Sequence, residues 1–265
     1  IVAMIILIVR AGFKHQQVQQ QQYVEAFKLL AANQTQTNKL MLGGVTDIYG
    51  TNGVKALKSA GSSRWGGLDA LPEPEETPEE KTEMRELAAK CEDLGVRIDQ
   101  ATNRKNNSKN VSELVYKLAM KLGLHQHEAM VYFCAAMVYD SGFLAIDSEL
   151  LSADVLSSRD KMKLKRHVDQ TDDYLQFVPK RYWQVFSDAS TKHHENMDGS
   201  GYPEGLKGDE IPQVARLIRV AETFISLSSK RNYHEIADKE TAVAKMKEQP
   251  QFYDPDVVGA LEEII

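Results

Sequence analysis

The sequence has few cysteines, no excess of positive charge and no alternating strand pattern. Its two cysteines, Cys91 and Cys134, form no paired motif, which excludes a disulfide framework and a cysteine zinc site and fits a reducing compartment. A formal net charge of −6 argues against a general nucleic-acid-binding protein, because neutralising phosphates requires a basic surface. With 42% hydrophobic and 26% charged residues, the chain has the composition of a folded globular protein.

The chain opens on isoleucine and a run of nine apolar residues, "IVAMIILIV". A membrane span needs about 20 apolar residues, so we expect this run to be the end of a transmembrane helix that starts upstream. Arg10, Lys14 and His15 follow, and basic residues beside a membrane helix mark its cytoplasmic side. Residues 1–15 therefore predict a membrane anchor, with the remainder on the cytoplasmic face of the inner cell membrane. A buried apolar helix or a signal-peptide core are the alternatives.

Composition predicts three further regions. Residues 16–42, rich in Gln and Asn, suit a juxtamembrane helix, and residues 43–77 are glycine-rich and then acidic with prolines, as in an irregular linker. Trp65 is an isolated large aromatic in this linker, and we expect it to dock on its own domain. Residues 78–265 form the helical domain.

Capping signals and periodicity predict an all-α domain. Thr77, Pro78 and two glutamates are typical of a helix start, and apolar residues from Val111 to Leu122 mark one helical face that ends before Gly123. The segment "HEAMVYFCAAMVYD" is apolar nearly all round, as expected of a central buried helix. Further helices are expected over 158–175, 179–192, 212–227, 239–248 and 255–265.

One segment, "HHENMDGSGYP" at residues 193–203, carries the chemistry. Imidazoles are suitable ligands for iron, zinc or manganese, and glycines permit close backbone approach and positive φ. A lone His-His pair also occurs by chance on protein surfaces, but the extended string is more specific.

This segment resembles the HD-GYP family, whose members hydrolyse cyclic di-GMP with two or three metal ions inside a helical bundle. "GLKGDEIPQVARLIRVAETFISLSSKRNYH" continues the likeness, "CAAMVYDSGFLAI" is similar to the family's A-A-L-L-H-D-I-G-K-I-G-I, and "LKRHVDQTDDYL" to its K-x-H-P-x-x-G-x-x-I-L. The resemblance covers roughly residues 95–265. It implies an all-α HD-GYP-type bundle preceded by the membrane-proximal helix and the Gly/Pro-rich linker.

The resemblance also implies a damaged metal site. Five positions where the family places ligands or a lysine carry other residues here: Asn103, Asn107, Tyr139, Phe143 and Ile225. Five positions keep a donor: Asp140, His167, His193, His194 and Glu222. Such a set suits one divalent ion of iron, manganese or zinc but not a polynuclear cluster. Relic histidines with internal hydrogen bonds and no metal are the alternative.

The Gly-Tyr-Pro loop is better preserved than the metal site. The matching positions expected to bind ligand are Asp198, Gly199, Gly201, Tyr202 and Pro203. Arg216, Lys230 and Arg231 lie near the cleft by analogy, and arginine binds phosphate in a bidentate manner. Turn geometry alone is the alternative reason for the loop.

We therefore predict a degenerate, catalytically inactive HD-GYP protein. Its role would be docking or regulation within a membrane-associated bacterial envelope or motility-related assembly of proteins, without DNA or RNA. The alternatives are a slow, metal-dependent cyclic di-GMP phosphodiesterase, with Asp140 in the catalytic centre, and a receptor that binds cyclic di-GMP without hydrolysing it.

Overall fold

The computed structural model describes residues 65, 77–153, 155–228 and 238–265. The predicted juxtamembrane helix and most of the predicted linker lie outside these residues. The described part belongs to the unit Ser62–Ile265 and contains α-helices joined by short turns and 3-10 helices, with no strand among the described residues. The α-helices are α3 Pro78–Ala101, α4 Asn107–Lys121, α5 Gln126–Met137, α6 Ser148–Leu151, α7 Ser158–Lys165, α8 Trp183–Lys192, α9 Gln213–Ser228, α10 Lys239–Lys247 and α11 Pro255–Ile264.

Side-chain caps set several helix starts. Thr77 caps α3 in a reciprocal capping box with Glu80, and Pro78 occupies the first turn, where its missing N–H costs no hydrogen bond. Asp254 accepts a hydrogen bond from the Asp256 backbone N–H and caps α11 in the same way. These local signals explain why the predicted starts of both helices are confirmed.

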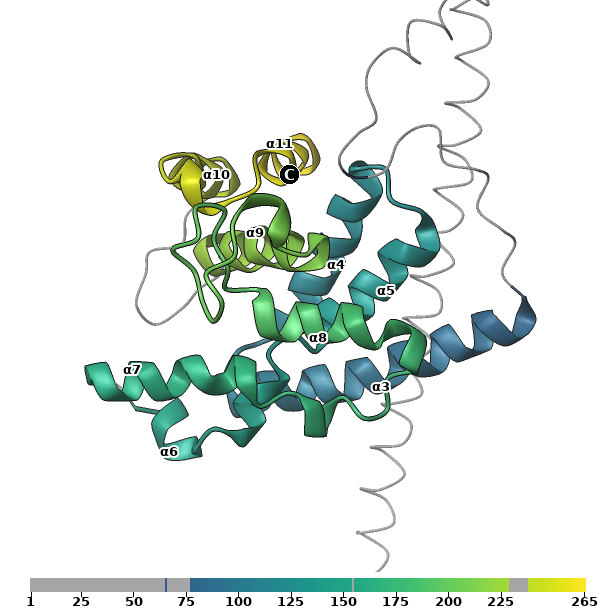
Figure 1. Cartoon of the computed structure of the whole chain (residues 1–265), viewed down its shortest axis with the longest axis horizontal. Helices are drawn as coiled ribbons and strands as arrows, with labels where there is room; N and C mark the ends of the chain where they lie inside the picture. Colours follow the sequence, from purple (N-terminus) through teal and green to yellow (C-terminus); the bar gives the residue numbers. More distant parts are fainter. Residues whose placement is uncertain (1–64, 66–76, 154, 229–237) are drawn as a thin grey trace, which may run out of the picture. The chain divides into compact units, whose positions relative to one another are not determined.

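Helix α5 lies at the centre of the bundle. It packs against α3, α4 and α8, while α4 also packs against α9 and α11 (Figure 1). Most of α5 is buried, which agrees with its nearly uniform apolar sequence. Helices α6 and α7 bury no side chain and lie at the lower left of Figure 1, toward one end of the bundle. The all-α prediction is confirmed.

One predicted helix is interrupted. The sequence predicted a continuous helix over 158–175, whereas α7 ends at Lys165 and the chain continues in 3-10 turns at Arg166–Asp169 and Asp172–Tyr174. The tighter turns change the direction of the chain and accompany the burial of His167, whose exposed fraction is 2%. The α-helical periodicity of the segment gave no sign of this break.

The predicted membrane anchor and its localisation require correction. Among the described residues, no helix combines the length and the apolar character needed to cross a bilayer. Residues 1–15, on which the prediction depended, lie outside the described residues. The anchor and the location at the inner membrane face are therefore withdrawn.

Trp65 docks on its own domain, as predicted. Only 3% of its surface is exposed, and its indole Nε1 donates a hydrogen bond of 3.2 Å to the Asp256 carboxylate at the start of α11. The Arg216 guanidinium lies 4.7 Å from the centre of the indole ring, within cation–π range. Trp65 thus completes the core beside α9 and α11.

The Trp65→Ala variant should lower the free energy of unfolding by about 3 kcal/mol, because it removes a buried aromatic side chain and leaves a cavity. Urea denaturation would measure the change. Val155→Ala is the control, since Val155 is 87% exposed and should change stability by less than about 0.5 kcal/mol. Equal effects of the two substitutions would contradict the docking of Trp65.

Candidate metal centre

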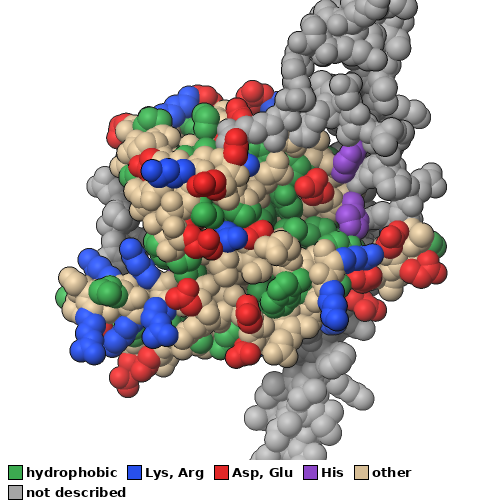
Figure 2. All heavy atoms as spheres, in the orientation of Figure 1, with side chains coloured by type: hydrophobic (Ala, Val, Ile, Leu, Met, Phe, Trp, Pro, Cys, Tyr) green, Lys and Arg blue, Asp and Glu red, His purple; other side chains and the backbone are tan. Residues whose placement is uncertain are grey.

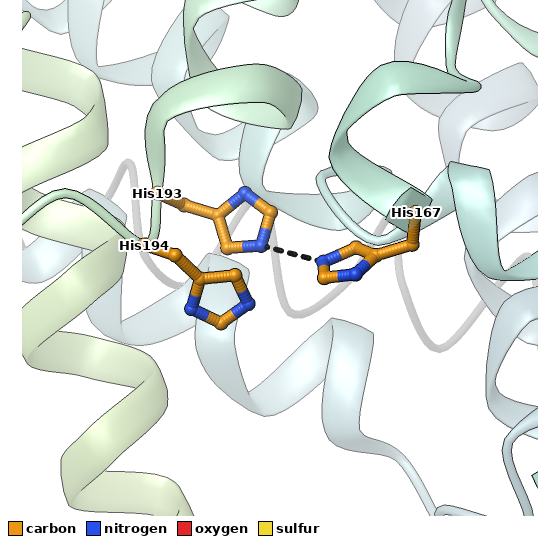
Figure 3. A group of neighbouring side chains, drawn as sticks. All are labelled: His167, His193 and His194. Atoms are coloured by element: carbon orange, nitrogen blue, oxygen red, sulfur yellow. Dashed lines mark hydrogen bonds between the residues drawn. The ribbon is translucent and has the colours of Figure 1, made fainter. Parts of the chain in front are cut away.

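Three helix ends bring the predicted donor residues together. Asp140 follows α5 at the start of the 3-10 helix Ser141–Ala145, His167 lies in the turn after α7, and His193 ends α8 with His194 next to it. Figure 3 shows His193 and His194 side by side, facing His167 from the opposite side of the pocket. His167, His193 and His194 each offer a ring nitrogen within 4.8 Å of the others.

Backbone carbonyls fix the tautomers of two histidines. The Nδ1 atom of His167 lies 2.8 Å from the Leu164 carbonyl oxygen, and Nδ1 of His193 lies 2.9 Å from that of Ala189. Because a carbonyl only accepts, both Nδ1 atoms carry the hydrogen, and Nε2 is the nitrogen of each ring left to bind a metal. This is the arrangement that orients metal-binding histidines.

The inward-facing donors have the spacing of a coordination shell. The Nε2 atoms of His167 and His193 are 3.2 Å apart, and Asp140 Oδ1 lies 3.5 Å from the first and 3.6 Å from the second. Donors about 2.1 Å from a tetrahedral ion are about 3.4 Å from one another. Asp140 Oδ1 is buried and has no hydrogen-bond partner. A divalent cation placed among these buried acceptor atoms would pair with all three, so these residues fit a divalent metal.

Burial and neighbouring charge keep the donors in their metal-binding forms. Burial opposes ionisation of Asp140, but Arg104 first, and then the nearby histidines, outweigh it and hold the pKa of Asp140 well below its usual value. Burial lowers the pKa of His167 to about 4, although Asp140 opposes the shift. Burial and then the two neighbouring histidines lower the pKa of His194. At neutral pH the carboxylate is therefore charged, and His167 and His194 are neutral.

Asn107 and Tyr139 lie at two of the positions where the family resemblance implies metal ligands. Asn107 donates a buried hydrogen bond of 3.2 Å to the Tyr139 hydroxyl, so two of the substituted positions now contact each other. Burial raises the pKa of Tyr139 well above its usual value, which keeps the phenol neutral and a poor ligand. Asn103 has a left-handed backbone, with φ 51° after the end of α3, a conformation that asparagine tolerates. An amide–phenol hydrogen bond thus occupies the place of a metal ligand pair.

Glu222, another predicted donor, lies on α9 and is half-buried. Burial and then the charge of Asp140 raise its pKa. Its carboxylate is not part of the histidine cluster. The structure thus clusters the three histidines and places Asp140 beside two of them, His167 and His193.

The Gly-Tyr-Pro loop is held against the histidines by Glu195. This buried carboxylate accepts backbone hydrogen bonds from Glu204, Gly205 and Leu206 at 2.7, 3.1 and 3.1 Å. The Tyr202 ring stacks on His194, with ring centres 4.8 Å apart. A Cβ atom on Gly201 would lie 2.5 Å from the His194 carbonyl oxygen. The Gly-Tyr-Pro loop and His194 are therefore packed together as one unit.

The other predicted ligand-binding residues of the loop are engaged in contacts within the loop, and two of the predicted basic residues lie outside the described part of the chain. Asp198 accepts hydrogen bonds from the backbone and hydroxyl of Ser200, Gly199 has φ +81°, and Pro203 follows Tyr202 through a cis bond. Lys230 and Arg231 lie outside the described residues.

Arg216 is buried and ion-paired with Asp254 at 2.7 Å. It also contacts Asp209 and the Trp65 ring. Because these contacts already engage its guanidinium, we leave Arg216 out of the proposed ligand site.

Two residues that position the site were missed from the sequence. Glu195 lay inside the quoted motif, directly after the histidines, but its role depends on backbone N–H groups nine to eleven residues later. Arg104 lies in the polar stretch "NRKNNSKN", where nothing distinguished it from its neighbours. Its NH1 group lies 2.7 Å from Asp140 Oδ2.

A helical bundle with an Asp/His pocket of this kind defines a class of metal-binding helical domains, and comparisons assign the family. The HD domain family matches residues 82–257, so the chain belongs to the HD domain family. The resemblance inferred from the motifs is thereby confirmed. A solved structure, "Bd1817, a HDG"Y"P protein from Bdellovibrio bacteriovorus", has a similar fold, with a TM-score of 0.50 and 20% identity over 70% of this chain and 65% of that one.

Curated relatives point to cyclic dinucleotides. "Cyclic di-GMP phosphodiesterase response regulator RpfG" of Xanthomonas campestris pv. campestris (strain 8004) is 37% identical over 57% of this chain and 40% of its own length. "3'3'-cGAMP-specific phosphodiesterase 2" of Vibrio cholerae serotype O1 is 32% identical over 56% of this chain and 28% of its own. "Cyclic di-GMP phosphodiesterase" of Thermotoga maritima is 29% identical over 61% and 44%. The chain thus matches less than half the length of each of these relatives.

The Glu195→Gln variant should lower the free energy of unfolding by about 1–3 kcal/mol, because its amide NH₂ would face a backbone N–H that now has an acceptor. Urea denaturation would give the change, and hydrogen exchange at Gly205 should accelerate as the loop loosens. Glu204→Gln is the control, since its side chain is exposed. Unchanged exchange in Glu195→Gln would contradict the role of this carboxylate.

The Gly142→Ala variant should weaken metal binding about 10- to 100-fold, because the new Cβ would lie 1.8 Å from the His167 carbonyl oxygen and displace that residue. Calorimetric titration with Mn²⁺ would measure the affinity. Gly259→Ala on α11 is the matched control, since its Cβ meets nothing within 4 Å. An undiminished affinity in Gly142→Ala would show that the position of His167 does not govern metal binding.

Proposed function

We propose that this chain is a single-metal HD domain that binds a cyclic dinucleotide of the cyclic di-GMP type and hydrolyses it slowly or not at all. The observation that carries the proposal is the 3.2 to 3.6 Å spacing of Asp140 Oδ1, His167 Nε2 and His193 Nε2. His194 completes a set of three nitrogens and one oxygen, which suits iron, manganese or zinc. The names of the curated relatives supply the ligand class.

The residues around the donors favour binding of a phosphodiester. A bound divalent ion would act as a Lewis acid toward the phosphate oxygens. The Tyr202 ring, stacked on His194 and with the Lys165 ammonium 4.4 Å from its centre, would place a planar surface and a positive charge beside the ion. Bases stack on aromatic rings in many nucleotide sites. The Glu195-held loop keeps this surface in place before any ligand arrives, which reduces the ordering cost of binding.

Rapid hydrolysis is disfavoured by the opposite wall of the pocket. Two-metal hydrolysis requires ligands for a second ion that stabilises both the attacking and leaving oxygens. Here Asn107 and Tyr139 hydrogen-bond to each other, and neither provides a charged or imidazole donor. We therefore favour a receptor-like or residual phosphodiesterase activity over ordinary turnover.

A second candidate is the docking or regulatory role predicted from the sequence. In this role the domain would bind an acidic surface of a partner protein. Helix α7 favours it, because Lys and Arg side chains gather over this helix at the lower left of Figure 2. The basic residues of α7 and the turn after it are exposed: Arg159, Lys161, Lys163, Lys165 and Arg166. These basic side chains would be complementary in charge to an acidic surface.

Elemental analysis of protein reconstituted with Mn²⁺ should find about one ion per chain, and His193→Ala should lose it, because removing one of the few donors leaves too incomplete a shell. Calorimetry should then detect cyclic di-GMP binding by metal-loaded protein and none after chelation of the metal. Turnover should be slower than about 0.01 per second, against the 1–10³ per second of typical enzymes.

The control is His125→Ala, a histidine outside the donor cluster, which should keep the ion and the binding. Two or three ions per chain, or turnover on the order of one per second, would contradict the single-metal proposal. A protein without metal and without cyclic di-GMP binding would favour the docking role.

A further inference from the structure

The end of α3 carries an arginine into the metal pocket. Helix α3 closes at Thr102, Asn103 adopts φ 51°, and the Arg104 backbone N–H bonds to the Asp99 carbonyl oxygen at 2.8 Å. The left-handed residue reverses the chain, so that the next side chain points back over the bundle. Asn103 lies at a position where the family resemblance implies a ligand. Here it forms a turn that directs the Arg104 side chain into the pocket.

Arg104 is held by the donor residues themselves. Its NH1 group lies 2.7 Å from Asp140 Oδ2, with side-chain exposures of 19% and 2% for the arginine and the aspartate. Its guanidinium carbon lies 5.2 Å from the centre of the Phe143 ring. Phe143 in turn stacks on His167, with ring centres 4.1 Å apart and planes 6° from parallel. The phenyl ring therefore connects the arginine to a metal-binding histidine.

We propose that the Arg104 guanidinium takes the place of a second metal ion: it supplies the positive charge on the Asn107–Tyr139 side of the pocket and restricts Asp140 to binding one ion. The inference rests on the proposed single-metal function and identifies the residue that sets the metal count. Arg104 acts through Asp140, as a positioning residue.

The geometry of Asp140 gives the first reason. A carboxylate that bridges two ions through both of its oxygens offers one oxygen to each. Here Oδ2 is engaged by Arg104 at 2.7 Å, and only Oδ1 faces His167 and His193. A charge-assisted hydrogen bond of this length is among the stronger polar contacts in proteins. Arg104 therefore competes with a second ion for Oδ2, and Oδ1 is the oxygen of Asp140 without a hydrogen bond.

Charge gives the second reason. Asp140 and Glu222 are the acidic groups of the pocket, and both interact electrostatically with Arg104. A buried carboxylate requires a compensating cation, which a metal cluster would otherwise provide. The guanidinium fills this need without metal ligands, and it repels a second divalent ion that approaches the same side. The substitutions at Asn107 and Tyr139, both neutral, are consistent with a pocket whose charge is already balanced.

Metal stoichiometry in pairs of variants that differ only at residue 104 tests the inference. The background is Asn107→His/Tyr139→His, which returns two imidazoles to the pocket. Elemental analysis should find about one ion per chain in this background with Arg104, and about two when Arg104→Ala is added. Arg104→Lys should stay near one ion, because lysine retains the positive charge.

Arg97→Ala in the same background is the matched control. Arg97 is an exposed arginine on α3, and its removal should leave the count near one ion. Equal counts with and without Arg104 would overturn the inference and identify the Arg104–Asp140 pair as purely structural. A second ion bound while Arg104 is still present would overturn it as well.

A second measurement remains decisive if the triple variant does not fold. In the single variant Arg104→Ala, Asp140 lacks its counter-cation, so Mn²⁺ should raise the melting temperature more than in the unsubstituted protein or Arg104→Lys. An equal or smaller rise would overturn the inference. Failure of the proposed function has a different signature, since it would appear in the unsubstituted protein as no ion or as two or three ions, whereas the difference between the paired variants alone decides the role of Arg104.

Discussion

The convergence of three acceptor atoms in a dry pocket governs the organisation of this domain. The Nδ1 hydrogens of His167 and His193 are donated to backbone carbonyls, so their Nε2 atoms face each other and the oxygen of Asp140 that has no hydrogen bond. A divalent cation placed among these atoms would pair with all three. The break after α7 and the close backbone contact at Gly142 both serve to position His167 in this set.

Internal contacts engage the polar and charged side chains next to this group. Asn107 and Tyr139 satisfy each other, and Arg104 satisfies Asp140 while lying over Phe143. The sequence indicated that Phe143 removes a positive charge from the site. In the structure, Arg104 places a positive charge beside Phe143. Arg104 lies in the turn after α3, more than thirty residues earlier in the chain. These side chains therefore satisfy one another's polar and charged groups.

The preserved loop has a packing explanation that is compatible with a binding role. Gly201 is pressed against the His194–Asn196 backbone, and Glu195 holds the following turn through three backbone N–H groups. Loss of either contact would disturb His194 directly. The loop thus positions His194 and the Tyr202 ring stacked on it.

The sequence by itself determined the all-α class and the starts of α3 and α11, and it singled out the three histidines that the fold clusters, because caps, periodicity and a dense motif are local signals. Only the tertiary structure decided the break after α7, the hold of Glu195 on its loop and the pairing of Arg104 with Asp140. Each of these depends on groups brought together from separate elements. A polar stretch such as "NRKNNSKN" reads as a solvated turn until the fold places a buried carboxylate beside one of its arginines.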